Sequence, residues 1–228
     1  MNLESWSPPP LPPRTVIKGR YATLEPLSPD HFDGLREAHA EDATDAMWTY
    51  LPVGPFDDAG YRAWLEANRI LPDPLHFAVR MADGRLGGTL SLMRINPSAG
   101  TIETGWLTFA PRLQRTREAT EAVYMLMQWS LEAGYRRFEW KCNAENIASR
   151  RAAQRFGFSY EGVFRQAGVV KAKNRDTAWF ACIDQEWPAL KAAFETWLAP
   201  ENFDRSGRQR QRLGDLTRPV LVAHDPAL

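Results

Sequence analysis

The sequence contains few cysteines and histidines, and it has no long apolar run. Two cysteines, Cys142 and Cys182, cannot form a disulfide framework, so we expect a reduced, cytoplasmic compartment. The four histidines lack metal-ligand spacing and no CxxC or HExxH motif occurs, so no metal is expected. No apolar stretch approaches the roughly 20 residues that span a bilayer. The N-terminus also lacks the basic and apolar regions of a secretory signal, and none is expected.

The chain also lacks net charge, since 28 Lys and Arg residues balance 28 Asp and Glu residues. This balance argues against a nucleic-acid partner and against a polybasic membrane binder. The charges are nevertheless unevenly distributed. Residues 21–83 contain 4 basic and 12 acidic residues, whereas residues 112–175 contain 13 basic and 6 acidic residues. This asymmetry indicates either two sites of opposite charge preference or two solvated faces.

The remaining composition is that of a globular protein of one domain. The chain has 228 residues, of which 44% are hydrophobic, and nine Trp and eleven Phe supply apolar area for a core. Residues 5–13 include five prolines and predict an extended arm. The arm is either a ligand for an SH3-type groove or a stiff segment packed on the body. We expect an arm at 1–19, a domain at 20–199 and an irregular, Arg-rich tail at 200–228 that packs on or near the domain.

Hydrophobic periodicity and turn residues predict an ordered series of strands and helices. Ser28, Asp57 and Asn146 are placed to cap helices. The predicted order is one mixed α/β (α+β) domain rather than a run of βαβ units. Strands are expected at 21–27, 76–82, 86–95, 101–109, 138–142, 160–170 and 176–186, with a loop at 171–175, and helices at 28–40, 57–70, 115–132, 146–156 and 188–198.

Four segments resemble the GCN5-related N-acetyltransferases (GNAT), in the RimJ/RimL-like branch. They are I-E-T-G-W-L at 102–107, P-R-L-Q-R-T-R-E-A-T-E-A at 111–122, N-A-E-N-I-A-S-R-R-A at 143–152 and G-F-S-Y-E-G-V at 157–163. The resemblance covers about residues 20–187. It implies a single GNAT-type domain with a mixed, mostly antiparallel sheet flanked by helices. It also implies acetyl-CoA as cosubstrate and direct acetyl transfer to a primary amine through a tetrahedral intermediate.

The segment from Gln114 to Ala119 leads into a helix N-terminus, where free amides and the helix dipole favour an anion. The resemblance implies that this loop, with Gln114, Arg115, Thr116, Arg117 and Ala119, holds the pyrophosphate of coenzyme A. Arg117 stands where the family usually has glycine, which puts close approach of the backbone to the phosphate in doubt. Arg115 and Arg117 could compensate with charged hydrogen bonds. The alternative is an ordinary basic helix start.

Asn146 and Ser149 begin the next predicted helix, and capping alone would explain Asn146. The resemblance implies that Asn146 contacts the pantetheine arm and that Ser149 lies near the thiol. Many members of the family have a tyrosine one turn later that protonates the thiolate. Ala153 occupies that position here, so Ser149 is the candidate general acid.

Glu103 lies on the strand predicted at 101–109, where alternation puts it on the face of Gly105, Leu107 and Phe109. A carboxylate among apolar neighbours is either a structural ion-pair partner or a base with a raised pKa. The resemblance implies a general base at Glu103. It also implies that the cofactor contacts Leu107, Thr108 and Phe109, with the amide near Leu107 as oxyanion donor. Gly105 fits the place where this strand separates from its neighbour.

Other conspicuous side chains in this region have a structural interpretation. Trp106 and Trp140 are predicted to be core residues. No histidine lies near Cys142 in the sequence to activate it as a nucleophile, so we interpret it as a buried strand residue.

The residues and the resemblance together predict an N-acetyltransferase. Its acceptor would be a protein N-terminus, a polyamine or another small cationic amine, drawn to the acidic segment 21–83, while the basic segment 112–175 would bind the phosphates. The resemblance implies that the helices expected at 28–40 and 57–70 border the acceptor site, and Asp57 and Asp58 are two examples of its acidic residues. The alternatives are a catalytically silent acyl-CoA-binding or regulatory module and an interaction scaffold that uses the proline-rich arm. A monomer and a homodimer both remain open.

Overall fold

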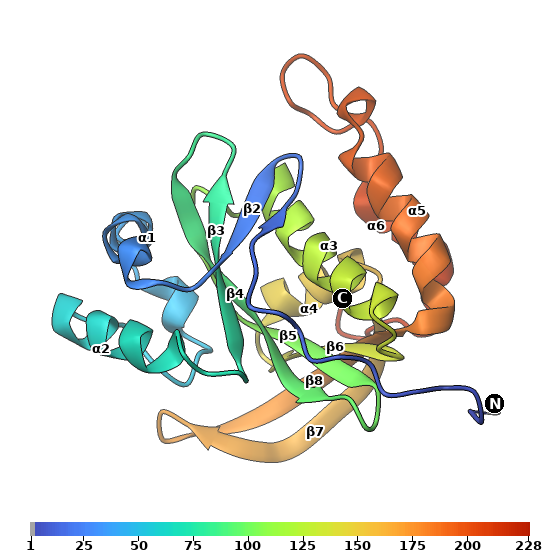
Figure 1. Cartoon of the computed structure of the whole chain (residues 1–228), viewed down its shortest axis with the longest axis horizontal. Helices are drawn as coiled ribbons and strands as arrows, with labels where there is room; N and C mark the ends of the chain where they lie inside the picture. Colours follow the sequence, from blue (N-terminus) through green and yellow to red (C-terminus); the bar gives the residue numbers. More distant parts are fainter. Residues whose placement is uncertain (1–2) are drawn as a thin grey trace.

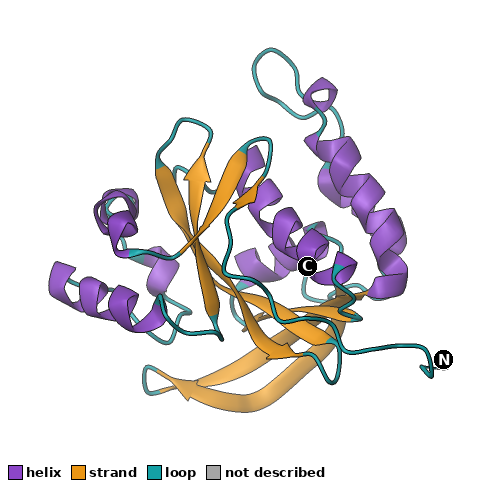
Figure 2. Cartoon of the chain, in the orientation of Figure 1, coloured by secondary structure: helices purple, strands orange, loops and turns teal. Residues whose placement is uncertain are grey.

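Eight strands form one mixed sheet in the computed structural model, which describes residues 3–228 (Figures 1 and 2). The strand order is β1-β2-β3-β4-β5-β6-β8-β7, and every neighbouring pair is antiparallel except the parallel pair of β5 and β6. The expected mixed, mostly antiparallel sheet is therefore confirmed. The strands are β1 (Ile17–Lys18), β2 (Ala22–Pro26), β3 (Leu75–Met81), β4 (Leu86–Asn96), β5 (Thr101–Phe109), β6 (Arg137–Asn143), β7 (Ser159–Val170) and β8 (Lys173–Ile183).

Helices cover both faces of the sheet. In Figure 1, α1 and α2 lie together on one side, and α3, α4, α5 and α6 lie on the other. Within residues 3–228, no helix combines the length and the apolar character needed to cross a membrane. The helices are α1 (Phe32–His39), α2 (Asp58–Asn68), α3 (Arg117–Glu132), α4 (Ile147–Arg155), α5 (Trp187–Leu198) and α6 (Leu213–Thr217), with 3-10 turns η1 (Pro29–His31), η2 (Ala46–Trp48), η3 (Asp184–Glu186), η4 (Pro200–Asn202) and η5 (Arg218–Val220).

Side-chain capping sets the starts of η1, α2, α3 and α4. Ser28 Oγ accepts a hydrogen bond from the Asp30 amide and opens the turn that leads into α1. Asp57 Oδ1 accepts from the Gly60 amide at 2.7 Å and caps α2. The helix expected from residue 115 begins at Arg117, because Arg115 has a φ of 62°. The expected helices are thus confirmed, with ends that differ by a few residues.

Glu121 of α3 fixes the start of β2. Its side chain is buried, and its carboxylate accepts hydrogen bonds from the amides of Arg20, Tyr21 and Ala22 at 2.8, 2.6 and 2.8 Å. Three backbone donors on one buried carboxylate satisfy groups that the short β1–β2 connection would otherwise leave unpaired. This contact holds the N-terminal strands against the helix whose first turn is the predicted phosphate site.

The hairpin of β7 and β8 is tighter than predicted. The expected loop at 171–175 is reduced to Lys171 and Ala172, which have φ values of 49° and 59°. Two residues with positive φ form the type of turn that matches the twist of the flanking strands, so pairing continues to the end of the hairpin. Arg175 therefore belongs to β8 and not to a loop.

Both terminal segments pack on the domain. In the arm, Pro9 is buried and the Tyr135 hydroxyl donates a hydrogen bond to the Pro10 carbonyl at 3.1 Å. The tail, expected to be irregular, includes the short helix α6, because Leu213 and Thr217 are fully buried in the core. The proposed boundaries of arm, domain and tail stay predictions.

Candidate active site

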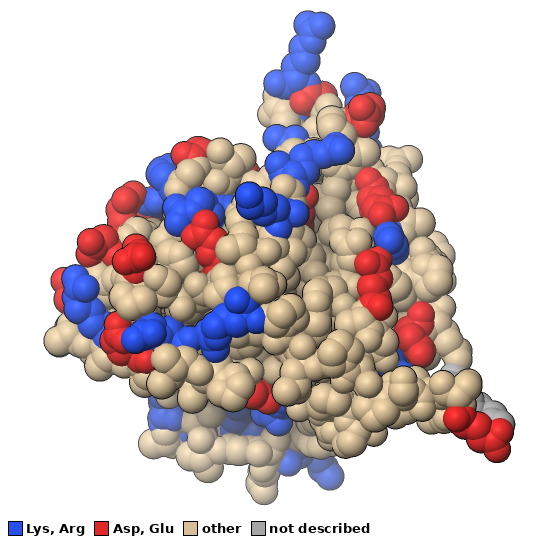
Figure 3. Space-filling view, viewed as in Figure 1, with Lys and Arg blue, Asp and Glu red and all other residues tan. Residues whose placement is uncertain are grey.

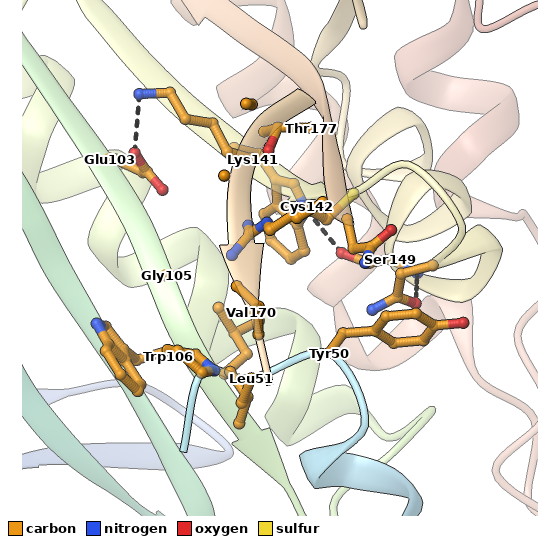
Figure 4. A pocket seen from close by; sticks show the side chains of 18 of the residues that line it. Tyr50, Leu51, Glu103, Gly105, Trp106, Lys141, Cys142, Ser149, Val170 and Thr177 are labelled. Carbon is orange, nitrogen blue, oxygen red and sulfur yellow. Dashed lines mark hydrogen bonds and ion pairs between the residues drawn. The ribbon is translucent and has the colours of Figure 1, made fainter. Parts of the chain in front are cut away.

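The central parallel pair of strands separates and opens a cavity. β5 and β6 pair over only four positions, from Thr101 opposite Arg137 to Thr104 opposite Trp140. Beyond Thr104, β5 pairs on that side with none of the described residues, as expected for the strand that contains Gly105. A cavity of about 420 Å³ lies at this opening, lined by β4, β5, β6, β7, β8, the start of α4 and the segment after η2 (Figure 4). Its size is that of a small-molecule site.

Glu103 lies on one side of the cavity in a chain of ion pairs (Figure 4). It is only 4% exposed, and its carboxylate lies 3.0 Å from Lys141 Nζ and 3.1 Å from Arg94 Nε. Lys141 also lies 2.6 Å from Glu139, which is shared with Arg137. Burial raises the pKa of Glu103, and the positive charges of Lys141 and Arg94 oppose that rise. The side chain thus combines the two interpretations left open above, since it is ion-paired and has a raised pKa.

The prediction that Glu103 shares a face of its strand with Leu107 and Phe109 is wrong, because β5 contains a bulge. Ser91 pairs with Gly105 and Thr89 with Thr108, so two residues of β5 lie opposite one of β4, and Trp106 has a φ of 53°. Such a bulge reverses the alternation of side chains. Leu107 and Phe109 consequently pack with the main core, on the opposite face from Glu103.

The cofactor residues predicted on β5 can contribute mainly through their backbone. The Thr108 side chain is buried and its hydroxyl bonds with that of Thr89 at 2.7 Å. The Phe109 carbonyl accepts a hydrogen bond from Gln114 Nε2 at 2.7 Å. Leu107 lines the cavity. The end of β5 therefore joins the cavity to the start of α3.

The α4 start lies across the cavity from Glu103 in the view of Figure 4. Asn146 Oδ1 caps the helix by accepting from the Ser149 amide at 3.1 Å. The Ser149 hydroxyl accepts from Trp140 Nε1 at 2.9 Å, and all three residues line the cavity. Burial raises the pKa of the neighbouring Cys142 thiol to about 11, so this cysteine is not a thiolate nucleophile near neutral pH.

The tail of the chain holds this helix start in place. Arg150 forms two hydrogen bonds of 2.6 Å to Asp225, and it also donates to the Ala144 carbonyl at 2.7 Å. Arg150 and Asp225 are both buried. The loop before α4 and the C-terminal tail are therefore joined by one ion pair that nothing local in the sequence indicates.

The predicted phosphate loop lies at the α3 start, outside the cavity lining. Thr116 Oγ1 caps the helix and occupies the Ala119 amide at 3.1 Å. The Arg117 guanidinium lies between the rings of Tyr21 and Phe203, 4.7 Å from the centre of each. The amide of Arg117 lies in the first helical turn, where no intrahelical acceptor exists. Among the described residues, Arg115 and the amides of Arg117 and Glu118, rather than the Arg117 side chain, are thus the groups available to meet an anion.

Several of the cavity-lining residues were not assigned to the site from the sequence. Trp140 belongs to the core, as predicted, and also borders the cavity. Trp106, also predicted as core, lines the cavity, as do Arg94, Lys141 and Arg175. Alternation along β6 could have placed Lys141 on the face of Glu139. No sequence signal links Lys141 to Glu103, because that contact depends on which strands are neighbours.

Known proteins are similar to this chain in both fold and sequence. The Acetyltransferase (GNAT) domain family matches residues 22–159. A GCN5-related N-acetyltransferase from Brucella melitensis is 46% identical, with a TM-score of 0.92 over 95% of this chain and 100% of that chain. A probable GNAT-family acetyltransferase from Chromobacterium violaceum is 40% identical, with a TM-score of 0.77 over 83% of this chain and 96% of that one.

The fold extends to a more distant protein. A RimL ribosomal L7/L12 alpha-N-protein acetyltransferase is 23% identical and shares the fold, with a TM-score of 0.65 over 76% of this chain and 99% of its own. No curated protein is significantly similar to the chain. With the family match, the close structural relatives and the separated strands together, this chain belongs to the GCN5-related N-acetyltransferase family, an enzyme family whose membership implies the use of acetyl-CoA.

Proposed function

We propose that this acetyltransferase transfers the acetyl group of acetyl-CoA to a primary amine by direct attack, with Glu103 as general base. The observation that carries the proposal is a buried, ion-paired carboxylate that lines the cavity beside the strand opening. Its raised pKa lies closer to the range in which a carboxylate takes a proton efficiently.

The proposed reaction balances its protons within the cavity. Glu103 takes a proton from the substrate ammonium, directly or through a water. The neutral amine nitrogen attacks the thioester carbonyl, and the carbon–sulfur bond breaks as the tetrahedral intermediate collapses. The departing thiolate takes a proton for which the Ser149 hydroxyl is the candidate donor, and Ser149 regains a proton as the nitrogen loses its second one. When Glu103 becomes neutral, Lys141 keeps its pair with Glu139 at 2.6 Å. Proton transfer to Glu103 therefore leaves no buried lysine without a counter-charge.

The cofactor-binding assignments are also proposals. Coenzyme A supplies the activated acetyl group as a thioester, and the free backbone edge of β5 beyond Thr104 is suited to bind its extended arm. The first-turn amides of α3 and the nearby Arg115 suit its phosphates. Asn146 lies at the cavity, where it suits the pantetheine amides. No metal is part of this proposal.

The acceptor classes predicted from the sequence were a protein N-terminus, a polyamine and another small cationic amine. The front segment does line the cavity, but with the uncharged residues Met47, Tyr50, Leu51 and Pro52. Its acidic side chains gather on the outer surface over α1 and α2, among arginines (Figure 3). The expected attraction of a cation to the acidic segment therefore has no support inside the cavity. A cytoplasmic site of action and a monomer or homodimer remain proposals.

The test follows thiol release from acetyl-CoA with a panel of amines. We expect Glu103→Gln to lower kcat by about 100-fold or more, as loss of a general base does, with acetyl-CoA binding unchanged. Glu161→Gln is the matched control, because it removes a carboxylate that pairs with Arg137 and neither contacts Lys141 nor lines the cavity. Ser149→Ala should lower kcat less, since the thiolate is a good leaving group.

The pH profile adds a second readout. A base with a raised pKa is deprotonated only above that pKa, so kcat of the wild type should fall as the pH falls through it. In Glu103→Gln, this fall in kcat at low pH should be absent. Equal activity of Glu103→Gln and the wild type would contradict the role of Glu103. Tight acetyl-CoA binding without thiol release to any amine would instead indicate the silent binding module.

A further inference from the structure

One arginine in the cavity has no counter-charge. Arg175 of β8 lines the cavity, and its Nε atom is buried without a hydrogen-bond acceptor. Across residues 3–228, Arg175 has neither an ion pair nor a side-chain hydrogen bond. Arg175 as a whole is partly exposed, but its Nε donor is withdrawn from water, and a buried charged donor that gains no acceptor is costly. Such a group indicates an anion that binds from outside the protein.

The other charges of the cavity are already balanced. Lys141 lies between Glu103 and Glu139, and Arg94 pairs with Glu103. Glu139 is also paired with Arg137, which in turn binds Glu161. This chain of six side chains contains three cations and three anions. Arg175 is outside it and leaves the cavity with one unbalanced positive charge.

The hairpin geometry explains why no acid within residues 3–228 pairs with Arg175. Side chains alternate along β8, and Arg175, Thr177 and Trp179 all line the cavity. The neighbouring Asp176 lies on the opposite face, where its Oδ1 accepts from the Gln166 amide at 2.7 Å and from Asn174 Nδ2 at 2.9 Å. The cross-strand partner of Arg175 is Gly168, which has no side chain to offer.

The cavity around Arg175 suits a small acceptor with an apolar body. Its walls include Trp106, Phe164 and Trp179, and the segment after η2 crosses its rim. That segment is tied down on both sides. Lys171 Nζ donates to the Trp48 carbonyl at 2.8 Å, and the Tyr50 hydroxyl donates to the Glu145 carbonyl at 3.3 Å. A volume of about 420 Å³ under such a rim leaves room for a small molecule beside the thioester.

We propose that the acceptor is a small amine that also carries a carboxylate, and that Arg175 binds this carboxylate while the amine lies toward Glu103. The proposal rests on the acetyltransferase function proposed above and narrows its substrate class. Arginine matches a carboxylate with two parallel hydrogen bonds, which fixes orientation as well as affinity. A polyamine would instead bring a second positive charge toward an arginine without a counter-ion.

The experiment compares each acceptor as the free acid and as its amide. Thiol release is measured with α-amino acids, ω-amino acids and dipeptides, so that the separation of amine and carboxylate varies. For each acceptor, kcat/KM for the free acid is divided by kcat/KM for the amide. This acid-to-amide ratio is compared between the wild type and Arg175→Met, and the comparison cancels differences in amine basicity. We expect this ratio to fall by about 10- to 100-fold in the variant, the size of a lost charged hydrogen bond. Arg175→Lys should keep part of the preference.

The controls separate binding of the carboxylate from other effects. Arg165→Met removes an arginine of the same hairpin that lies in a separate surface hollow, so its ratio should match the wild type. Thermal unfolding of each variant checks that it folds. A ratio that does not change in Arg175→Met overturns the proposal. The proposal is also overturned if Arg175→Met differs from the wild type only in a higher KM for acetyl-CoA, because the anion that Arg175 binds would then belong to the cofactor.

A second measurement keeps the two proposals distinguishable. If the wild type acetylates no amine, the proposed function fails, and the carboxylate site is tested by binding alone. The probes are N-acetyl amino acids and their amides, and the readout is the rise in unfolding temperature that a bound ligand causes. A larger rise with the acids that disappears in Arg175→Met supports the site. Equal rises with acids and amides overturn it.

Discussion

The two walls of the cavity use charge in opposite ways. The front wall, made of α1, η2 and α2 over β3, keeps its acids outside and presents the uncharged side chains of Met47, Tyr50, Leu51 and Pro52 to the cavity. The rear wall, made of β6, α4, β7 and β8 with the tail, buries its charges in ion pairs such as Lys141 with Glu139 and Arg150 with Asp225. Charge summed along the sequence therefore does not predict charge in the site.

The two walls should differ most in how much the free energy of unfolding falls when one of their ion pairs is broken. Asp225 is a fully buried side chain whose loss leaves Arg150 buried and unpaired. We expect Asp225→Ala to lower the free energy of unfolding by about 3–5 kcal/mol, measured by urea denaturation. Asp58, whose side chain is 77% exposed beside Arg36, is the matched front-wall acid. Asp58→Ala should cost less than about 1 kcal/mol, and equal costs would erase the contrast.

Next in size is the pH response of the front wall. His76 is fully buried beside Trp64 and Trp106, and neither ring nitrogen has a hydrogen-bond partner in the part of the chain that the structure describes. Burial lowers the pKa of His76 to about 4. The pKa of His76 is lower in the folded than in the unfolded chain. The contribution of neutral His76 to the free energy of unfolding is therefore fully present above about pH 6.5 and is lost as the pH falls toward 4. The loss should reach about 3 kcal/mol at the acid end.

The variant His76→Phe keeps an aromatic ring but cannot be protonated. The stability of this variant is measured by urea unfolding at pH 7.5 and at pH values down to about 4. We expect it to fall by about 3 kcal/mol less than the stability of the wild type. The exposed His224 in the tail is the control, and His224→Phe should respond to pH as the wild type does. An unchanged slope in His76→Phe would mean that the pH response arises elsewhere.

The smallest effect is expected for the acids that the sequence favoured as the acceptor site. Asp57 caps α2 and Asp58 pairs with Arg36, both outside the cavity. The double variant Asp57→Asn, Asp58→Asn should leave the KM of every amine substrate within about twofold, because exposed charges act weakly across solvent. Asparagine can still cap the helix. A tenfold rise in KM would restore the acidic segment as the acceptor site.

Much of the fold could be predicted because its signals are local. Capping by Asp57 and Asn146 depends on amides two or three residues away, and both helix starts are confirmed. The strand at 101–109 matches β5 residue for residue. The bulge at Trp106 could not be predicted, because it depends on pairing with β4 and not on a turn residue in β5.

By itself, the sequence determined the family, the order of strands and helices and the presence of Glu103 on a strand near the cofactor motifs. Those features depend on contacts between near neighbours or on patterns read directly along the chain. The tertiary structure decided what surrounds Glu103, which side chains face the cavity and where charge is left over. Glu103 meets Lys141 only because β5 and β6 are adjacent, and Arg175 lacks a counter-ion only because Asp176 lies on the other face of β8. Such contacts follow from strand pairing across distant segments, which no local pattern specifies.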